Sequence, residues 1–290
     1  MFYDKIHIEQ SQQVTKERLQ KVMENSIKLG FIGCGKMASA IIGGCLASNE
    51  FNKENIFASE INDIARKNAS ENLGIKIFNN NIEVVKNADV IVFCVKPFVI
   101  KDVLKEVAPF VTKEKLVISI AAGIKIQTIK EFLTNAKIIR VMPNTPAMVK
   151  EGISAICPDN GIDEISKQTA QKIMNSVGET VLTEEKFIDA ITALSGSGPA
   201  YYYKIIDEMA NAAVKLGLDY ETALKLSAQT AIGSGKMILQ SGIDVPTLIK
   251  NVTTPGGCTE VGNKVLADSD ITKILYDTIF ETAKKAKELG

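Results

Sequence analysis

Short apolar runs alternate with amphipathic helical segments along residues 27–183. The runs are rich in Val, Ile and Phe and read SIKLGFIG, NIFASE, IKIFN, DVIVFCV, LVISIA, KIIRVMP, ISAICP and ETVLT. The first segment between them carries apolar residues at helical spacing, on one face: Ala38, Ile41, Ile42, Cys45 and Leu46. Strands that alternate with helices predict an α/β fold whose mostly parallel sheet is covered by helices on both sides.

After about residue 187 the strand-like runs stop and the pattern becomes helical. One long helix is predicted from apolar residues at helical spacing: Tyr202, Ile205, Ile206, Met209, Ala213 and Leu216. A thin helical domain of about 100 residues exposes much apolar surface, which an intertwined dimer would bury. We therefore expect an extension over 1–26, an α/β domain over 27–187 and an all-α dimerisation domain over 188–290.

The composition narrows the classes of function. The 34 basic and 34 acidic residues cancel, which argues against a broad nucleic-acid or membrane-surface footprint and leaves only a local patch open. No apolar run has the length of a membrane span, and the N-terminus lacks a signal-peptide core, so we expect a cytoplasmic protein. The five cysteines form no C-x-x-C pair, which fits single thiols in a reducing cytosol. Because the one histidine, His7, lies in the extension, we expect neither histidine-based catalysis nor a metal site.

The sequence GFIGCGKMA joins the first predicted strand to the first helix. Gly33 and Gly35 match the first two glycines of G-x-G-x-x-G/A, and Ala38 is its small third residue. These positions allow a tight turn, close approach of a pyrophosphate and close packing of helix on strand. The motif predicts a Rossmann-type dinucleotide site with the phosphates at the helix N-terminus. Two further strand ends should face the same crevice, CVKP at 94–97 and AAG at 121–123.

The end of the second strand bears on the choice of cofactor. Glu60 follows Gly35 by about the distance at which an acid binds the ribose hydroxyls of NAD, and its charge would repel a 2′-phosphate. Arg66 and Lys67 come soon after and could pair with such a phosphate, or could be solvated helix charges. The sequence therefore leaves the preference open.

Six motifs, in this order and spacing, resemble the pyrroline-5-carboxylate reductase family: GFIGCGKMA, VKP, SIAAG, RVMPNTPA, LSGSGPAY and TTPGG-x-T. The resemblance runs from about residue 27 to the end of the sequence. It implies a small-molecule substrate: NADPH or NADH delivers hydride to the imine carbon of L-pyrroline-5-carboxylate, giving L-proline in the last step of proline biosynthesis, with no nucleic-acid or membrane partner. It also implies a homodimer held by the helical domain, with a larger ring such as a decamer as a further assembly.

The resemblance assigns the family's contacts to this chain residue by residue. The cofactor contacts fall on Gly33, Cys34, Gly35, Lys36, Met37, Ala38, Asn81, Cys94, Val95, Lys96, Pro97, Ala121, Ala122, Gly123 and Asn251. The substrate contacts fall on Thr254, Gly257, Cys258 and Thr259. The chain departs from the family's usual residues at Lys36, Glu60, Cys258 and the EVG of 260–262. Of these, Glu60 bears most on cofactor choice, because it stands beside the expected 2′-phosphate position.

The TTPGG-x-T loop interrupts two helical segments at 253–259. Pro255 stiffens the turn, while Gly256 and Gly257 allow close backbone approach, so convergent N–H groups could bind the substrate carboxylate. We expect Thr259 to be the N-cap of the last helix, and the resemblance adds a contact of its hydroxyl with the imine nitrogen. Catalysis would then consist mostly of orientation over the nicotinamide, with solvent or Thr259 supplying the proton.

Two side chains and the function itself have alternative interpretations. Cys258 is either a substitute for a small residue or a redox-sensitive thiol beside the substrate. Lys204 stands six residues after Gly198, whereas the catalytic lysine of 3-hydroxyacid dehydrogenases stands four after its glycine, so we interpret Lys204 as a solvated residue. The alternative functions are a related imine or 3-hydroxyacid reductase and a non-catalytic dinucleotide-binding regulator.

Overall fold

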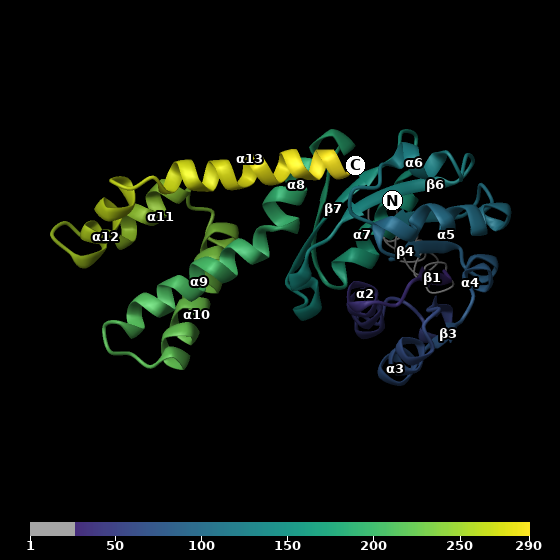
Figure 1. The fold of residues 1–290 in the computed structure, drawn as a ribbon, viewed down its shortest axis with the longest axis horizontal. Helices are drawn as coiled ribbons and strands as arrows, with labels where there is room; N and C mark the ends of the chain where they lie inside the picture. The colour runs from purple at the N-terminus through teal and green to yellow at the C-terminus, as the bar shows by residue number, and fades with distance from the viewer. Residues whose placement is uncertain (1–26) are drawn as a thin grey trace, which may run out of the picture. The chain divides into compact units, whose positions relative to one another are not determined.

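The computed structural model describes residues 27–290, and the extension over 1–26, with His7, lies outside the described residues. The described chain divides into two compact units, one that runs to Gly196 and includes Ala286–Gly290, and one formed by Ser197–Lys285. The strands all lie in the first unit, and the second consists of helices, as Figure 1 shows.

An eight-stranded sheet forms the centre of the first unit in the described part of the chain, in the order β3-β2-β1-β4-β5-β6-β7-β8. Its strands are β1 (Leu29–Ile32), β2 (Ile56–Ser59), β3 (Lys76–Phe78), β4 (Val90–Phe93), β5 (Leu116–Ser119), β6 (Lys137–Met142), β7 (Gly152–Pro158) and β8 (Gly178–Leu182). All neighbouring strands are parallel except β6 and β7, which are antiparallel. The predicted mostly parallel sheet is therefore confirmed.

Helices cover both faces of the sheet (Figure 1). One apolar core lies between the sheet and α2 (Lys36–Ala47), α3 (Asp63–Leu73) and α7 (Glu164–Asn175). The other lies between the sheet and α4 (Asn81–Asn87), α5 (Ile100–Val107), α6 (Ile126–Lys130) and α8 (Ile188–Ile191). Because both faces are covered, β1, β2, β4 and β5 are buried along their whole length, which is why their sequences are almost entirely apolar, with Ser59 and Ser119 at the ends of β2 and β5.

The strand order places the first strand in the middle of the parallel part of the sheet. β1 pairs with β2 on one side and with β4 on the other, so the chain reverses its direction of winding at β1. In open α/β sheets the ligand crevice lies at this reversal, outside the carboxyl ends of the strands. The residues that follow β1, β2, β4 and β5 are therefore the ones that the fold brings to a cofactor site.

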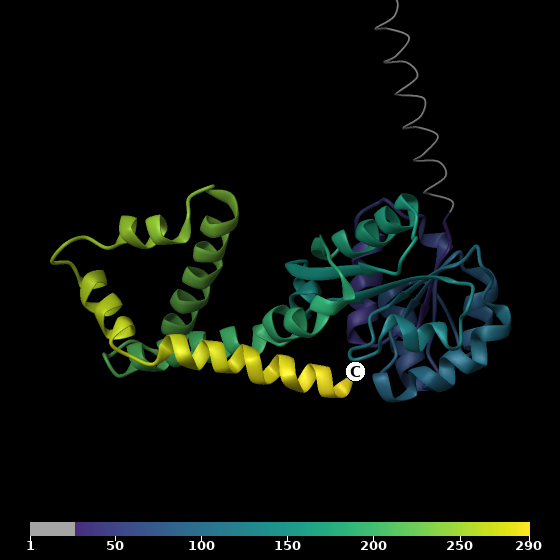
Figure 2. The same cartoon turned by 90° about the horizontal axis from the view of Figure 1, so that it is seen from above.

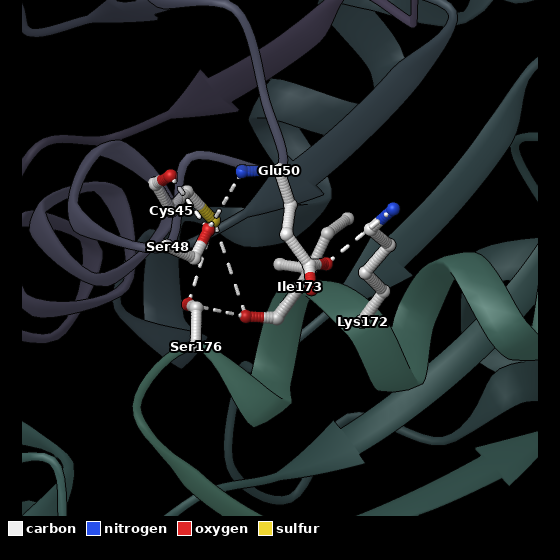
Figure 3. Close-up of polar contacts among 6 residues, drawn as sticks. All are labelled: Cys45, Ser48, Glu50, Lys172, Ile173 and Ser176. Atoms are coloured by element: carbon white, nitrogen blue, oxygen red, sulfur yellow. Dashed lines mark hydrogen bonds and ion pairs between the residues drawn. The ribbon is translucent and has the colours of Figure 1, made fainter. Parts of the chain in front are cut away.

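The end of α2 is fixed against the turn that leads from α7 into β8 (Figure 3). Gly44 packs so closely there that a Cβ would lie 2.5 Å from Val177 Cγ1 and 2.6 Å from Ser176 O. The Cys45 Sγ lies 3.5 Å from Ser176 Oγ, and burial raises the pKa of this thiol to about 12, so it is protonated. The contact thus fixes the C-terminal end of the helix whose N-terminal end carries the glycine motif.

Asp163 caps α7 and supports a prediction about stability. Its carboxylate accepts a hydrogen bond from Ser166 N at 2.8 Å and forms an ion pair with Lys137 Nζ at 2.7 Å. These contacts, chiefly the one with Lys137, lower the pKa of Asp163 to about 2. We expect Asp163→Ala to lower the free energy of unfolding by about 1 kcal/mol at neutral pH.

The pH dependence of that difference follows from the sign of the shift. A carboxylate with a lowered pKa in the folded state stabilises the fold above its unfolded pKa and loses this effect as the pH falls. The difference between wild type and Asp163→Ala should thus shrink as the pH drops from 3.8 towards about 2. Urea unfolding of both proteins over this range tests the cap, and a difference that stays constant would contradict it.

The second unit is all-helical, as predicted. Its helices are α9 (Gly198–Val214), α10 (Tyr220–Gln240), α11 (Val245–Val252), α12 (Cys258–Ala267) and most of α13 (Ile271–Leu289). α9 packs on α10, and the Ser227 hydroxyl donates to Ile206 O at 3.0 Å across this pair. Figure 2 shows the helices of this unit from a second side. Tyr201 on α9 and Thr282 on α13 share a hydrogen bond of 2.8 Å between their hydroxyls.

This unit has almost no core of its own in the single chain. The spacing that predicted α9 is right, yet Tyr202, Met209 and Leu216 are 64%, 58% and 89% exposed. Among the described residues of α11, α12 and α13, none is buried. Apolar surface of this extent marks an interaction face. None of the described helices is long and apolar enough to cross a membrane.

Candidate active site

The glycine motif forms the turn between β1 and α2. Gly33 has a φ of +87°, and its N–H donates to Ser59 O at 3.0 Å, which ties the turn to the end of β2. A Cβ on Gly33 would lie 3.1 Å from Val95 Cγ1, whereas one on Gly35 would have no atom within 4 Å. Gly33 is therefore required by the turn, and Gly35 borders open space that a ligand can enter.

The N-terminus of α2 opens onto that space. Gly35 is its N-cap without a side-chain bond, and the first turn of α2 holds no acidic residue. The first N–H groups of a helix have no acceptor within the helix and carry its positive dipole end, so they bind phosphate. A cavity of about 440 Å³ lies here, lined among others by Lys36 and Ser39 of α2 and by Asn68 of α3. This cradle fits a dinucleotide.

The other predicted residues of the motif serve packing. Ala38 is 1% exposed, Cys34 is 6% exposed, and Met37 packs against the same core. Burial also raises the pKa of the Cys34 and Cys94 thiols, so both are neutral and poor nucleophiles. The described residues contain no group of three or more His, Cys, Asp or Glu that could hold a metal ion.

Glu60 bridges the glycine turn and the start of α3. Its Oε2 accepts from Cys34 N at 3.3 Å and its Oε1 from Asn62 N at 3.0 Å. The guanidinium of Arg66 reaches back to the same corner, where Nη1 donates to Glu60 O at 3.1 Å. Lys67 instead is 76% exposed and lies 3.9 Å from Glu71. The sequence left open whether Arg66 or Lys67 could pair with a 2′-phosphate, and of the two it is Arg66 that contacts Glu60.

The ends of β4 and β5 complete this edge of the sheet. Cys94 N donates to Ile32 O at 2.8 Å, which places Cys94 and Val95 beside Gly33. Lys96 and Pro97 are exposed beyond them. After β5, Ala121 is buried, Ala122 is exposed and Gly123 has a φ of +75°. The structure thus brings the three predicted strand ends to one edge of the sheet.

Asn81 is also at this edge, but its side chain is already paired. The Asn81 amide oxygen accepts from Ser59 Oγ at 2.7 Å, and its amide nitrogen donates to Glu106 Oε2 at 2.8 Å. Asn81 is 8% exposed and Ser59 is 0% exposed. Sequence reasoning missed Ser59 and Glu106, because neither belongs to a recognisable motif. Asn81 holds the end of β2, and hence Glu60, in place.

The TTPGG loop of the second unit is a tight turn followed by a helix N-terminus. Gly257 N donates to Thr254 O at 2.8 Å, and Gly256 has a φ of +71°. With Pro255 before that glycine, this is the pattern of a type II turn. Gly257 is the N-cap of α12, so the prediction that Thr259 is an N-cap is wrong: the helix begins at Cys258, and Thr259 is its second residue.

Glu260 occupies one of the loop's N–H donors. Its Oε2 accepts from Gly256 N at 2.8 Å. In this structure the Gly256 N–H is therefore occupied by a carboxylate of the same chain. Sequence reasoning noted Glu260 only as a departure from the family; an acid in the third position of the helix is the signal that could have found it.

The remaining predicted residues of the second unit face solvent in the single chain. Asn251 on α11, Thr254 in the turn and both Cys258 and Thr259 on α12 are exposed. Their polar atoms are therefore accessible to a ligand. Lys204 is 71% exposed and pairs with Glu208, which confirms its interpretation as a solvated helix residue.

Comparisons with known proteins agree on one family. Residues 185–289 match the family model described as pyrroline-5-carboxylate reductase dimerisation. Residues 28–123 match the model described as NADP oxidoreductase, coenzyme F420-dependent. The pyrroline-5-carboxylate reductase of Glycine max is 38% identical over 91% of this chain and 97% of that protein. The one of Methanosarcina acetivorans is 38% identical over 92% of this chain and 99% of that protein.

Solved structures give the same result. The Plasmodium falciparum pyrroline carboxylate reductase, solved with NADP bound, superposes with a TM-score of 0.82 at 34% identity, covering 92% of this chain and 99% of that chain. The Coxiella burnetii pyrroline-5-carboxylate reductase superposes with a TM-score of 0.87 at 35% identity, with the same coverage. The likeness includes both the sheet-containing part and the helical part.

Proposed function

Because this chain belongs to the pyrroline-5-carboxylate reductase family, we propose that it reduces L-pyrroline-5-carboxylate to L-proline with NADH or NADPH. The observation that carries this function is the TTPGG turn, which presents Thr254 and Thr259 to solvent and already holds a carboxylate, that of Glu260. A regulator that only senses a dinucleotide has no need of such a second anion site.

The cofactor site of the proposal lies at the carboxyl ends of β1, β2, β4 and β5. When bound, the reduced nicotinamide supplies the hydride that the reaction needs. The glycine turn and the start of α2, from Gly33 to Ala38, hold the pyrophosphate, with the backbone N–H groups from Gly35 to Ala38 as the donors. The Glu60 carboxylate accepts hydrogen bonds from the ribose hydroxyls. Because its negative charge repels a 2′-phosphate, NADH is the preferred cofactor. Asn251 stays assigned to the cofactor through the family resemblance.

The substrate is a ring with a carboxylate and an imine nitrogen. The N–H groups of Gly256 and Cys258 receive its carboxylate once the Glu260 side chain has moved away, while the Gly257 N–H stays bonded to Thr254 O within the turn. Thr259 positions the imine nitrogen by a hydrogen bond. The reaction adds a hydride to the imine carbon and a proton to the nitrogen, with solvent or Thr259 as the proton source, so the chain contributes mainly orientation.

The proposed assembly is a homodimer through the second unit. The apolar side chains exposed on α9 to α13 need a partner surface, and a second copy supplies the same surface by symmetry. A ring of dimers such as a decamer is the further assembly, and the cytoplasm is the proposed location. Light scattering of the purified protein measures the number of copies directly.

Thr259→Ala tests the proposed substrate contact. We expect the turnover number to fall about tenfold, because one hydrogen bond that positions the imine is lost. Steady-state kinetics with pyrroline-5-carboxylate measure it. Thr278→Ala, on an exposed hydroxyl that bonds Ile274 O within α13, is a matched control and should leave turnover unchanged. Unchanged turnover in Thr259→Ala would remove Thr259 from the mechanism.

A further inference from the structure

Two opposite charges meet where the cofactor's ribose would lie. Glu60 follows β2 and repels a 2′-phosphate, while Arg66 reaches the backbone carbonyl of the same residue at 3.1 Å. An arginine at this place is a natural ligand for a phosphate, because its planar guanidinium donates two parallel hydrogen bonds. The end of β2 therefore carries Glu60, which disfavours NADPH, next to Arg66, which could bind the 2′-phosphate of NADPH.

Arg66 is held by a second carboxylate. Its Nη2 lies 2.6 Å from Asp63 Oδ1, one turn earlier on α3. The side chain of Arg66 is 25% exposed and that of Asp63 is 86% exposed. An ion pair with so exposed a partner is weak, because water solvates the released carboxylate well. A phosphate with nearly two negative charges can displace Asp63 from Arg66.

Neighbouring charges do not share this arrangement. Lys67 is 76% exposed and lies 3.9 Å from Glu71, an exposed pair one turn further along the helix. The ion pair of Lys67 is with Glu71, whereas Arg66 bonds both to Glu60 and to Asp63. Arg66 and Asp63 are thus distinguished by geometry, and Lys67 with Glu71 provides an internal comparison.

We infer that Asp63 and Arg66 form an exchangeable phosphate clamp that lets this chain use NADPH in spite of Glu60. In the free chain Asp63 neutralises Arg66. When the cofactor carries a 2′-phosphate, Arg66 exchanges Asp63 for the phosphate, while Glu60 still favours NADH. This inference rests on the cofactor site of the proposed function, but not on the identity of the substrate.

The first test measures binding without any reaction. Calorimetric titration of the full chain with 2′,5′-ADP and with 5′-AMP isolates the contribution of the 2′-phosphate. We expect Arg66→Gln to weaken 2′,5′-ADP about tenfold or more while 5′-AMP binds within twofold of wild type. Asp63→Asn should tighten 2′,5′-ADP about threefold. Lys67→Gln is the matched control and should bind both as wild type does.

Kinetics give the second reading. The ratio of kcat/KM for NADPH to that for NADH should fall in Arg66→Gln and rise in Asp63→Asn, in step with the titrations. If Asp63→Asn has a lowered melting temperature, Asp63→Ser is measured in its place, since it also removes the charge and leaves the N-cap Asn62 unchanged.

The outcomes separate the two levels of the proposal. If 2′,5′-ADP binds equally well to wild type and Arg66→Gln, the clamp is wrong, although the cofactor site stands. If neither nucleotide binds the wild-type chain, the cofactor site is wrong and the clamp with it. If nucleotides bind as expected but pyrroline-5-carboxylate is not reduced, the clamp stands and the proposed substrate is wrong.

Discussion

Gly33→Val is expected to weaken binding of both NADH and NADPH about a hundredfold, because a β-branched residue is strained at this backbone conformation. Gly33 has a φ of +87°, and a Cβ there would lie 3.1 Å from Val95 Cγ1 and 3.2 Å from Cys94 O. The turn cannot relax freely, since the Gly33 N–H is bonded to Ser59 O at 3.0 Å. The strain must move the turn that holds the pyrophosphate.

Gly43→Val is the matched control for this effect. Gly43 lies within α2, and a Cβ there would meet no atom within 4 Å. The dissociation constants of the Gly43→Val variant for NADH and NADPH should therefore remain near those of wild type. Fluorescence titration of the reduced cofactors measures both variants, and circular dichroism verifies that each is folded. Binding of NADH by folded Gly33→Val with wild-type affinity would contradict the proposed phosphate turn.

Glu185→Ala is expected to lower the free energy of unfolding of the first unit by about 3 kcal/mol, because it leaves a buried cation without its partner. Glu185 Oε1 accepts from Arg140 Nη1 at 2.9 Å and from Ile126 N at 2.8 Å. The Arg140 side chain is 6% exposed, so water replaces the lost carboxylate poorly. One substitution thus leaves both a charge and a backbone N–H unsatisfied.

The adjacent residue offers the control. Glu184 pairs with Lys186 at 2.8 Å, but both side chains are more than 60% exposed, and such pairs contribute about 1 kcal/mol or less. Glu184→Ala should therefore unfold at nearly the same denaturant concentration as wild type. Replacing Arg140 by Met together with Glu185 by Leu should recover much of the lost stability. Equal unfolding midpoints for Glu184→Ala and Glu185→Ala would refute the buried pair.

The sequence predicts the sheet and the glycine turn well, for physical reasons. Strands covered on both faces are mostly apolar, so β1 and β4 stand out as continuous runs. A turn from strand to helix that admits a phosphate requires small residues at fixed positions, and Gly33 and Ala38 meet this requirement. Both signals are local, so they survive without knowledge of the three-dimensional neighbours.

The pairing of polar side chains was not predictable in the same way. Thr259 looked like an N-cap, yet α12 starts at Cys258 because the turn ends at Gly257. Glu260 accepts a hydrogen bond from Gly256 N, and the spacing of the residues alone does not predict which N–H group of the turn it bonds. Such choices depend on rotamers and on competition between donors, which emerge only when the chain is folded.

The second unit shows a different limit. Its sequence predicted helices with more apolar surface than a thin domain can bury, and the structure of one chain leaves that surface exposed. A pattern of exposed apolar residues does not specify how a partner covers them. The order of assembly, from dimer to any larger ring, is therefore not contained in the periodicity of the sequence.

The central claim is tested most directly by following the oxidation of NADH and of NADPH, in parallel, with L-pyrroline-5-carboxylate as substrate and proline as the measured product. We expect proline to form with both cofactors, in a one-to-one ratio to the cofactor oxidised, and faster with NADH because of Glu60. A rate higher with NADPH would keep the activity and reject the role of Glu60. A folded protein that binds the cofactors but forms no proline would contradict the proposed function.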